Sequence, residues 1–216
     1  MSNPLAELIL TVVSYVTERG GYITKTKLLK LLYLFDVEFY RAHGKTFTSF
    51  QWKYFHLGPW TREFDPLLED LVAKGSITEQ LVEKPDFDAK FLRANESGSL
   101  TKTFGDYKDE LVLRNLLDLW GPSPTSEILD YVYFRTEPME HGIRNEPLDF
   151  SRVLQQLPEM YKRAASNATA GQIKAMRREF SQKVAEKLPS TPFEFTQPKY
   201  DEEFQAAIEK LNAGIV

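Results

Sequence analysis

The sequence contains no cysteine, which excludes disulfide bonds, thiol nucleophiles and thiolate zinc sites. It also lacks any apolar run near the roughly 20 residues that a helix needs to cross a bilayer. The opening stretch, MSNPLAELILTVVSYV, has no basic region ahead of its apolar part and carries Glu7 inside it, unlike a secretory signal. We therefore expect a cytoplasmic protein without a membrane segment.

Motifs for metal binding and catalysis are also missing. The three histidines, His43, His56 and His141, have neither a second histidine nor a carboxylate at a metal-ligand spacing. Neither a glycine-rich phosphate loop nor a G-x-S-x-G motif occurs. We therefore expect no metal, no cofactor and no enzymatic activity. A dispersed catalytic site near His56 and Trp60 is a weaker alternative.

The composition is that of a globular protein, because 42% of the residues are hydrophobic and 27% are charged. The formal net charge is −4, so unfocused attraction to nucleic acid or to a membrane is not expected. Charge is distributed unevenly, since residues 1–150 carry 17 Lys and Arg against 23 Asp and Glu, and residues 151–216 carry 10 against 8. We expect the two parts to face different partners.

Apolar residues at helical spacing predict a mainly helical front domain. The first helix is expected to run from Asn3-Pro4 to Gly20-Gly21, and the second from Thr24 or Thr26 to Gly44. Further helices are expected behind Asp65-Pro66 up to Gly75, over 106–120, and from Ser123-Pro124 to about residue 135.

Two short segments favour β structure. Aromatic residues alternate with polar ones over 46–57, which predicts a strand that Gly58-Pro59 ends. Residues 77–84 and 88–95 flank a turn around Pro85-Asp86 and predict a hairpin. The fold class is therefore mainly α with a small β element, an α+β domain followed by a helical C-terminal extension.

The second helix, KTKLLKLLYLFDVEFYRAHG (25–44), is apolar on two faces, which is typical of a helix surrounded by other elements. We expect its leucines and Phe35 to lie in the core. Its polar residues, in contrast, are expected on a rim that could meet a partner. This set comprises Lys27, Lys30 and Asp36, while Tyr33 suits either role.

The polar, proline-bearing segment 136–147 reads as a domain edge, so we divide the chain into a domain over 1–147 and an extension over 148–216. A short helix is expected at 149–157. Beyond it, two narrow apolar seams could dock onto a partner or onto the protein's own domain. One seam contains Ile173, Met176, Phe180 and Val184, and the other contains Phe204 and Ile208.

Three stretches, KLLKLLYLFD (27–36), HLGPWTREF (56–64) and LWGPSPTSEILDYVY (119–133), resemble the Panacea domain, the SocA-like antitoxin domain of bacterial toxin–antitoxin pairs. The likeness extends over about residues 5–140. Its most specific parts are the Lys-Leu-x-Lys-Leu-Leu-Tyr core and the strand that ends in Gly-Pro. The last family motif departs here, because TEPMEHG (136–142) lacks the matching histidine and tryptophan.

This resemblance implies a non-enzymatic antitoxin of a type II toxin–antitoxin system, which binds and neutralises a cognate toxin protein. It also implies a second mode, in which the antitoxin acts as an adaptor for a protease such as ClpXP. A homodimer stays open. The resemblance and the two seams together suggest that a partner contacts His56, Trp60, the polar residues of the second helix and the extension.

A DNA-binding regulator is the alternative function. Residues 4–44 could form a helix–turn–helix with lysines at the start of its second helix, where backbone phosphates often dock. The segment 162–188 is a second basic candidate, with seven Lys and Arg against two Glu. Against this reading, the second helix has little surface free to enter a groove.

Overall fold

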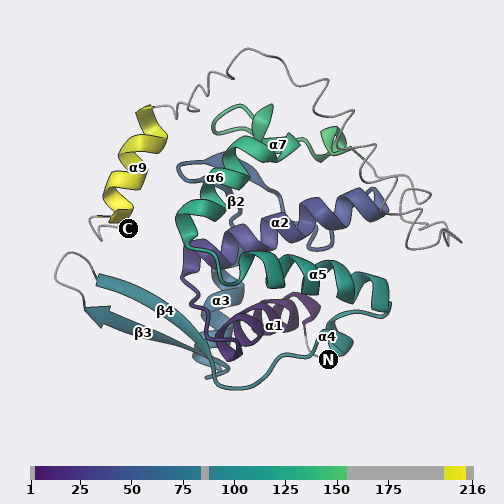
Figure 1. The fold of residues 1–216 in the computed structure, drawn as a ribbon, viewed down its shortest axis with the longest axis vertical. Coiled ribbons are helices and arrows are strands. Elements are labelled where there is room, and N and C mark those ends of the chain that lie inside the picture. The colour runs from purple at the N-terminus through teal and green to yellow at the C-terminus, as the bar shows by residue number, and fades with distance from the viewer. Residues whose placement is uncertain (1–2, 84–87, 155–201, 213–216) are drawn as a thin grey trace, which may run out of the picture. The chain divides into compact units, whose positions relative to one another are not determined.

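The structure is a computed structural model that describes residues 3–83, 88–154 and 202–212 (Figure 1). Its described part is mostly helical and contains two small antiparallel hairpins, which confirms the predicted fold class. The helices are α1 (Pro4–Glu18), α2 (Lys25–His43), α3 (Phe64–Ala73), α4 (Leu100–Thr103), α5 (Tyr107–Trp120), α6 (Thr125–Arg135), α7 (Glu137–Glu140), the 3₁₀ helix η1 (Phe150–Arg152) and α9 (Glu202–Asn212). The strands are β1 (Lys53–Phe55), β2 (Gly58–Trp60), β3 (Ile77–Glu83) and β4 (Asp88–Ala94).

Local sequence signals set the ends of the first two helices as predicted. The side chain of Asn3 accepts a hydrogen bond from the Leu5 backbone nitrogen at 3.0 Å, ahead of Pro4 at the first helical position. Thr24 caps α2 through the Lys27 nitrogen at 3.1 Å. Gly44 ends α2 in the left-handed region, with φ of 68°, which glycine adopts without a steric cost.

Helix α2 forms the centre of the core. It packs against α1, α5 and α6, and Figure 1 shows it running between α5 and α6. Leu28, Leu31, Leu32 and Phe35 are fully buried, which confirms their predicted core role. The two apolar faces of this helix are explained by neighbours on both sides.

The first hairpin differs from the predicted single strand over 46–57. Strand β1 covers only 53–55, although Phe50, Trp52 and Tyr54 are buried in the expected alternation. Gly58-Pro59 does not end the β structure but begins strand β2, which pairs with β1 across the two-residue turn His56-Leu57. Gly58 has φ of 89°, so this close turn depends on the conformational freedom of glycine. The second hairpin, β3–β4, forms as predicted, and its turn lies outside the described residues.

The segment 136–147, which was predicted to be a domain edge, packs into the domain. It begins with the buried Thr136 and contains α7, whose Met139 is buried in the core. Its later part lies alongside strand β1 and is hydrogen-bonded to it. The Tyr54 nitrogen donates to the Glu146 carbonyl at 3.0 Å, and the Asn145 nitrogen donates to the Tyr54 carbonyl at 2.7 Å. Backbone hydrogen bonds of this kind leave no periodic pattern of side chains. The short helix α4 was also missed.

The described parts of the predicted extension pack on the domain. Leu148 and Val153 are buried, and η1 replaces the described part of the predicted helix 149–157. The compact unit that holds the described residues comprises 1–155 together with 200–216, so α9 belongs to it and no boundary falls at residue 147. The seam residues Ile173, Met176, Phe180 and Val184 lie outside the described residues.

Candidate functional site

The two lysines expected on the exposed rim of α2 are buried, so that expectation is wrong. Lys27 Nζ donates to the carbonyl oxygens of Gly121 and Ser123, both at 2.7 Å, at the C-terminal end of α5. Carbonyls there lack helical partners and carry partial negative charge, so a cation is favourable. Lys30 Nζ donates to the Pro59 carbonyl at 2.6 Å. Both lysines therefore join α2 to elements that are distant in the sequence.

Burial shifts the ionisation of these two lysines. Loss of solvation lowers the pKa of Lys30 to about 7 and that of Lys27 to about 8. For Lys27 the surroundings also include the ring of Tyr22, whose centroid lies 4.4 Å from Nζ. Neutral carbonyls and a ring satisfy the ammonium groups without an opposing charge, so the lysines act as structural connections.

Asp36 and Tyr33 are also buried and do not lie on a rim. The Asp36 carboxylate accepts hydrogen bonds from the backbone nitrogens of Phe47 and Thr48, both at 2.9 Å, from the Thr48 hydroxyl, and from the Trp52 indole at 2.7 Å. Burial raises the pKa of Asp36, and these hydrogen bonds oppose that shift. The Tyr33 hydroxyl pairs with Thr136 Oγ1 at 3.0 Å.

The burial of this polar set has a consequence for DNA binding. Lys27, Lys30, Tyr33 and Asp36 have relative exposures of 2% or less. A side chain must reach the surface to contact a backbone phosphate, so Lys27 and Lys30 cannot serve a helix–turn–helix in this fold. The basic segment 162–188 lies outside the described residues.

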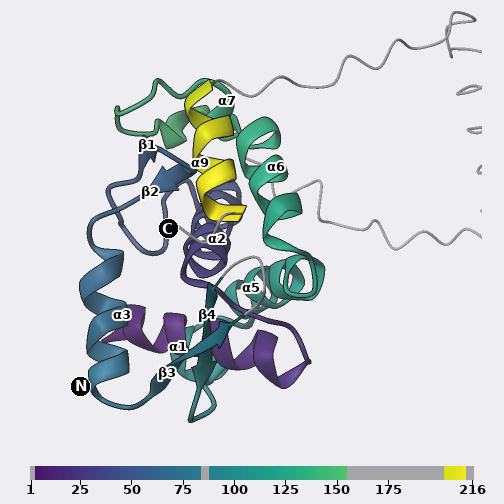
Figure 2. The same ribbon diagram turned by 90° about the vertical axis from the view of Figure 1, so that its left-hand side faces the viewer.

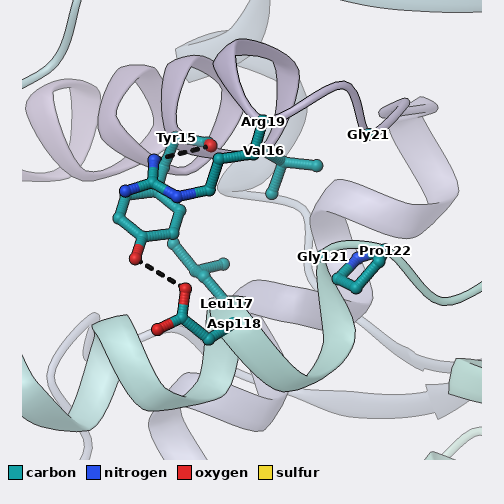
Figure 3. Close-up of a pocket in the computed structure, with 8 residues that line it drawn as sticks. All are labelled: Tyr15, Val16, Arg19, Gly21, Leu117, Asp118, Gly121 and Pro122. Carbon is teal, nitrogen blue, oxygen red and sulfur yellow. Dashed lines mark hydrogen bonds between the residues drawn. The ribbon is translucent and has the colours of Figure 1, made fainter.

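A small cavity lies between α1 and the end of α5 (Figure 3). Its volume is about 130 Å³, well below the roughly 300–1,000 Å³ of typical small-molecule sites. The polar groups on its wall are already paired, because the Tyr15 hydroxyl donates to Asp118 at 2.7 Å and the Arg19 guanidinium lies 3.5 Å from the Tyr15 ring centroid. Burial, and then the Asp118 hydrogen bond, raises the pKa of Tyr15. We assign this cavity a structural role.

The strongest candidate site is the surface that holds α9. We call it the C-terminal docking site and define it by Tyr54, His56, Tyr133 and Arg144. Figure 2 shows α9 (yellow) beside α6 and the β1–β2 hairpin. A histidine and an arginine from separate segments contact the Glu203 carboxylate of α9: His56 Nδ1 lies 2.9 Å from Oε1, and Arg144 Nε lies 3.0 Å from Oε2.

The aromatic part of the docking site receives the next residue of α9. Phe204 is only 1% exposed, and its ring centroid lies 4.5 Å from that of Tyr133. The Tyr133 hydroxyl accepts a hydrogen bond from Tyr54, and the Arg144 guanidinium carbon lies 4.7 Å from the Tyr54 ring centroid. Arg144 also donates to the Phe55 and His56 carbonyls at 3.4 and 3.3 Å. Arg144 therefore connects the hairpin, the tyrosine pair and α9.

The attachment of α9 is modest in energy. Burying one phenylalanine side chain contributes roughly 1.5–3 kcal/mol before ordering costs. The side chains of His56 and Glu203 are 58% and 42% exposed, and exposed ion pairs contribute about 0.2–1 kcal/mol each. Phe204 is therefore the main anchor of α9 on the domain.

The structure brings together some of the residues predicted for partner binding. His56 is exposed and contacts α9, and Trp60 is half-buried with its ring centroid 5.5 Å from that of Phe55. Phe204 lies in a seam that was predicted to dock onto a partner or onto the protein's own domain, and here it is buried against the domain. Ile208 is partly buried.

Sequence reasoning missed the residues that complete the docking site, Tyr54, Tyr133 and Arg144. Tyr54 was assigned to the predicted strand and Tyr133 to the predicted helix that ends near residue 135, and neither was assigned a role in binding. Arg144 lies in the segment that was predicted to be a domain edge, and an isolated arginine in a polar stretch does not indicate which residues it contacts in the fold. The one available signal was the acidic charge of α9, which favours a cation in any surface that the helix packs on.

Comparison of the chain with protein-family models gave no match, and searches of the curated proteins and of the solved structures gave none. In the part of the chain that the structure describes, no three acidic or histidine side chains cluster in a way that could hold a metal ion. No helix of that part has the length and apolar character required to cross a bilayer.

Proposed function

We propose that this protein is an antitoxin that neutralises a cognate protein toxin by direct contact. The observation that carries this proposal is that the three stretches resembling the Panacea domain contact one another. Lys27 from the first stretch binds the Gly121 and Ser123 carbonyls in the third, and Lys30 binds Pro59 in the second. The stretches that give the resemblance thus build one framework, as a shared domain requires.

The division of labour follows from this framework. The polar side chains of the Lys-Leu-x-Lys-Leu-Leu-Tyr core are buried and bonded inside the domain, so they specify the fold and leave recognition to other residues. We assign recognition to the periphery, namely the C-terminal docking site with α9 and the seam of Ile173, Met176, Phe180 and Val184. An apolar seam on a charged helix suits a groove on a partner.

The test is neutralisation in cells. The toxin candidate is the product of the reading frame next to this one, expressed with the full-length chain in a bacterial host. The proposal predicts that the wild-type chain restores growth and that Met176→Asp/Phe180→Asp loses protection. Gln182→Asp is the control, because in a helical segment it would place an added negative charge on the opposite face. Growth arrest despite abundant wild-type chain would overturn the proposal.

The adaptor mode predicts a different result in the same assay. If the protein hands the toxin to a protease such as ClpXP, toxin levels fall when the chain is present, and protection disappears in a host that lacks the protease. Direct neutralisation leaves toxin levels unchanged and persists in that host. Immunoblotting of the toxin in both hosts separates the two modes. The oligomeric state of the chain, including a homodimer, can be measured on the same preparations by light scattering.

A DNA-binding regulator is the second candidate, and the basic composition of residues 162–188 favours it. The buried lysines of α2 restrict this candidate to that segment. It predicts retention of the chain on duplex DNA with a salt dependence that weakens when Arg177 and Arg178 become alanine. Lys27→Ala would not change that salt slope, because the side chain does not reach solvent.

A further inference from the structure

The C-terminal docking site recognises two consecutive residues by different chemistry. Glu203 is held as a carboxylate by His56 and Arg144, at 2.9 and 3.0 Å. Phe204, the next residue, is held as an aromatic ring against Tyr133 and is 1% exposed. An acidic residue directly followed by an aromatic residue therefore satisfies both halves of the site.

The rest of α9 contributes less to this recognition. Its residues Glu202, Ala206 and Glu209 are exposed, so they place few demands on the site. A helix with another sequence at those positions can present the same acidic and aromatic pair. The site thus recognises a single helical turn, and a helix of another protein can carry the same pair of residues.

The docking site is held in place by contacts that do not involve α9. The Arg144 guanidinium donates to the carbonyls of Phe55 and His56 and lies over the Tyr54 ring. The Tyr54 hydroxyl donates in turn to Tyr133, on α6. Because these contacts fix the arginine and the aromatic wall in advance, the site loses little conformational freedom when a helix binds.

We propose that the C-terminal docking site is an exchangeable peptide-binding site, which α9 fills in cis and which a partner fills with a helix carrying an acidic–aromatic pair. Charge complementarity selects this partner, since a helix with a basic residue before the aromatic would face Arg144. That the partner is the toxin rests on the proposed function. The site and its preference do not depend on that assignment.

The experiment uses full-length chains and a fluorescent peptide of residues 200–216. In the Phe204→Ala chain the cis helix loses its anchor, and the labelled peptide binds in trans. The wild-type chain binds the same peptide at least about tenfold more weakly, because its own α9 occupies the site at high effective concentration. Fluorescence anisotropy gives both dissociation constants. Glu203→Lys, an exposed position, is the second variant and opens the site by repulsion from Arg144 without removing a buried ring.

Three controls define which residues the site recognises. A peptide with Phe204→Ala does not bind either variant chain, and the double variant Phe204→Ala/Arg144→Ala binds the wild-type peptide at least about tenfold more weakly than Phe204→Ala alone. An alanine-rich helix that carries only the acidic–aromatic pair and Ile208 binds within about tenfold of the native peptide. Equal binding of the peptide to wild-type and variant chains, or binding to neither variant, would overturn the proposal.

A last arm concerns the partner and uses the labelled peptide as a reporter. The cognate toxin is predicted to displace the peptide from the Phe204→Ala chain. A toxin that binds the chain without displacing the peptide contradicts the assignment of the partner helix. Failure of neutralisation in cells, with the peptide results unchanged, contradicts the proposed function and leaves the docking site intact.

Discussion

At the residue scale, the buried lysines of α2 are the most informative side chains. Sequence reasoning placed them on a surface because lysine is rarely fully buried without a charged partner. The structure gives Lys27 and Lys30 carbonyl partners from α5 and β2 instead. The lysines of the Lys-Leu-x-Lys-Leu-Leu-Tyr core thus form hydrogen bonds inside the domain. The sequence pattern alone cannot distinguish such buried lysines from lysines on an exposed basic face.

Burial of Lys30 predicts that stability depends on pH. Its pKa is lowered to about 7 in the folded chain, while an unfolded lysine keeps its proton to about pH 10.4. Between these values the unfolded chain binds more protons, so the free energy of unfolding rises with pH. For Lys30 alone we expect a rise of roughly 2 kcal/mol from pH 7 to 9.

Urea denaturation of the wild-type chain and of Lys30→Met at several pH values measures this slope. Lys30→Met is expected to lose the rise assigned to Lys30 and to keep any part that Lys27 contributes. The slope is the readout, because the substitution also leaves the Pro59 carbonyl without its donor and changes the absolute stability. Parallel curves for the two chains would show that Lys30 keeps its proton throughout this range.

Gly98 provides a second prediction at this scale. A Cβ at Gly98 would lie 2.3 Å from the Thr11 Cα and 2.4 Å from the Thr11 nitrogen, both backbone atoms of α1. Gly98→Ala is therefore expected to destabilise the chain by about 1–3 kcal/mol, through overpacking. Gly105→Ala is the matched control, since a Cβ there meets nothing within 4 Å. If the urea midpoints of the two variants coincide, the close approach of residue 98 to α1 is wrong.

At the element scale, helices were predicted well and the irregular segments poorly. Asn3, Thr24 and Gly44 mark helix ends through local chemistry that the sequence displays directly. The hairpin β1–β2 and the segment 136–147 depend on each other through backbone hydrogen bonds, such as that from the Tyr54 nitrogen to the Glu146 carbonyl. No local pattern records a partner 92 positions away, so these elements could not be predicted.

The same reasoning applies to the candidate site. His56 and Trp60 were selected from the sequence because they are unusual aromatic and titratable residues near a turn, and His56 does contact α9. Arg144 and Tyr133 join them through tertiary contacts between separate segments. A residue of the site could be predicted from the sequence where its local pattern was unusual. It could not be predicted where only the fold brings it to the site.

Asp36 gives a prediction about an element as a whole. Its carboxylate holds the segment 47–52 against α2 through four donors. Asp36→Ala would leave these donors buried and unpaired, at a cost of about 1–3 kcal/mol each for those that water cannot reach. We expect a loss of at least about 3 kcal/mol and faster hydrogen exchange at the Phe47 and Thr48 amides.

Asp118→Ala is the control for this substitution, because Asp118 is exposed and accepts one hydrogen bond, from Tyr15. Its expected cost is about 1 kcal/mol. Equal loss of stability in the two variants, with unchanged exchange at Phe47, would mean that the Asp36 contacts do not hold this segment.

At the scale of the whole molecule, the chain combines a domain with a buried polar framework and a C-terminal region that returns to it. Phe204, the anchor of α9, is buried against Tyr133 of the same chain. In the isolated chain this seam is therefore covered by the protein's own domain. Under the proposed function, a partner that binds the C-terminal docking site must compete with α9. This competition predicts that substitutions that weaken the binding of α9 to the domain change the affinity for the partner. If α9 stayed bound permanently, such substitutions would leave that affinity unchanged.

Arg144→Ala measures this coupling. Placed in the Phe204→Ala chain, where α9 is already released, it removes one side of the docking site, so a partner that uses the site loses affinity relative to Phe204→Ala alone. Glu203→Gln weakens only the internal helix, so the same partner gains affinity, by a few-fold. Opposite signs for the two substitutions, each relative to its parent chain, are the expected result in one binding assay. Equal affinities for each variant and its parent chain would place the partner elsewhere on the molecule.

The most direct test of the central claim uses two purified proteins and no other component. The chain and the product of the adjacent reading frame are mixed, and the activity of that product and the mass of the complex are measured together. Direct neutralisation predicts a stable complex and loss of toxin activity at equimolar ratio, with protease and DNA absent. Full toxin activity in the presence of excess chain would contradict the account.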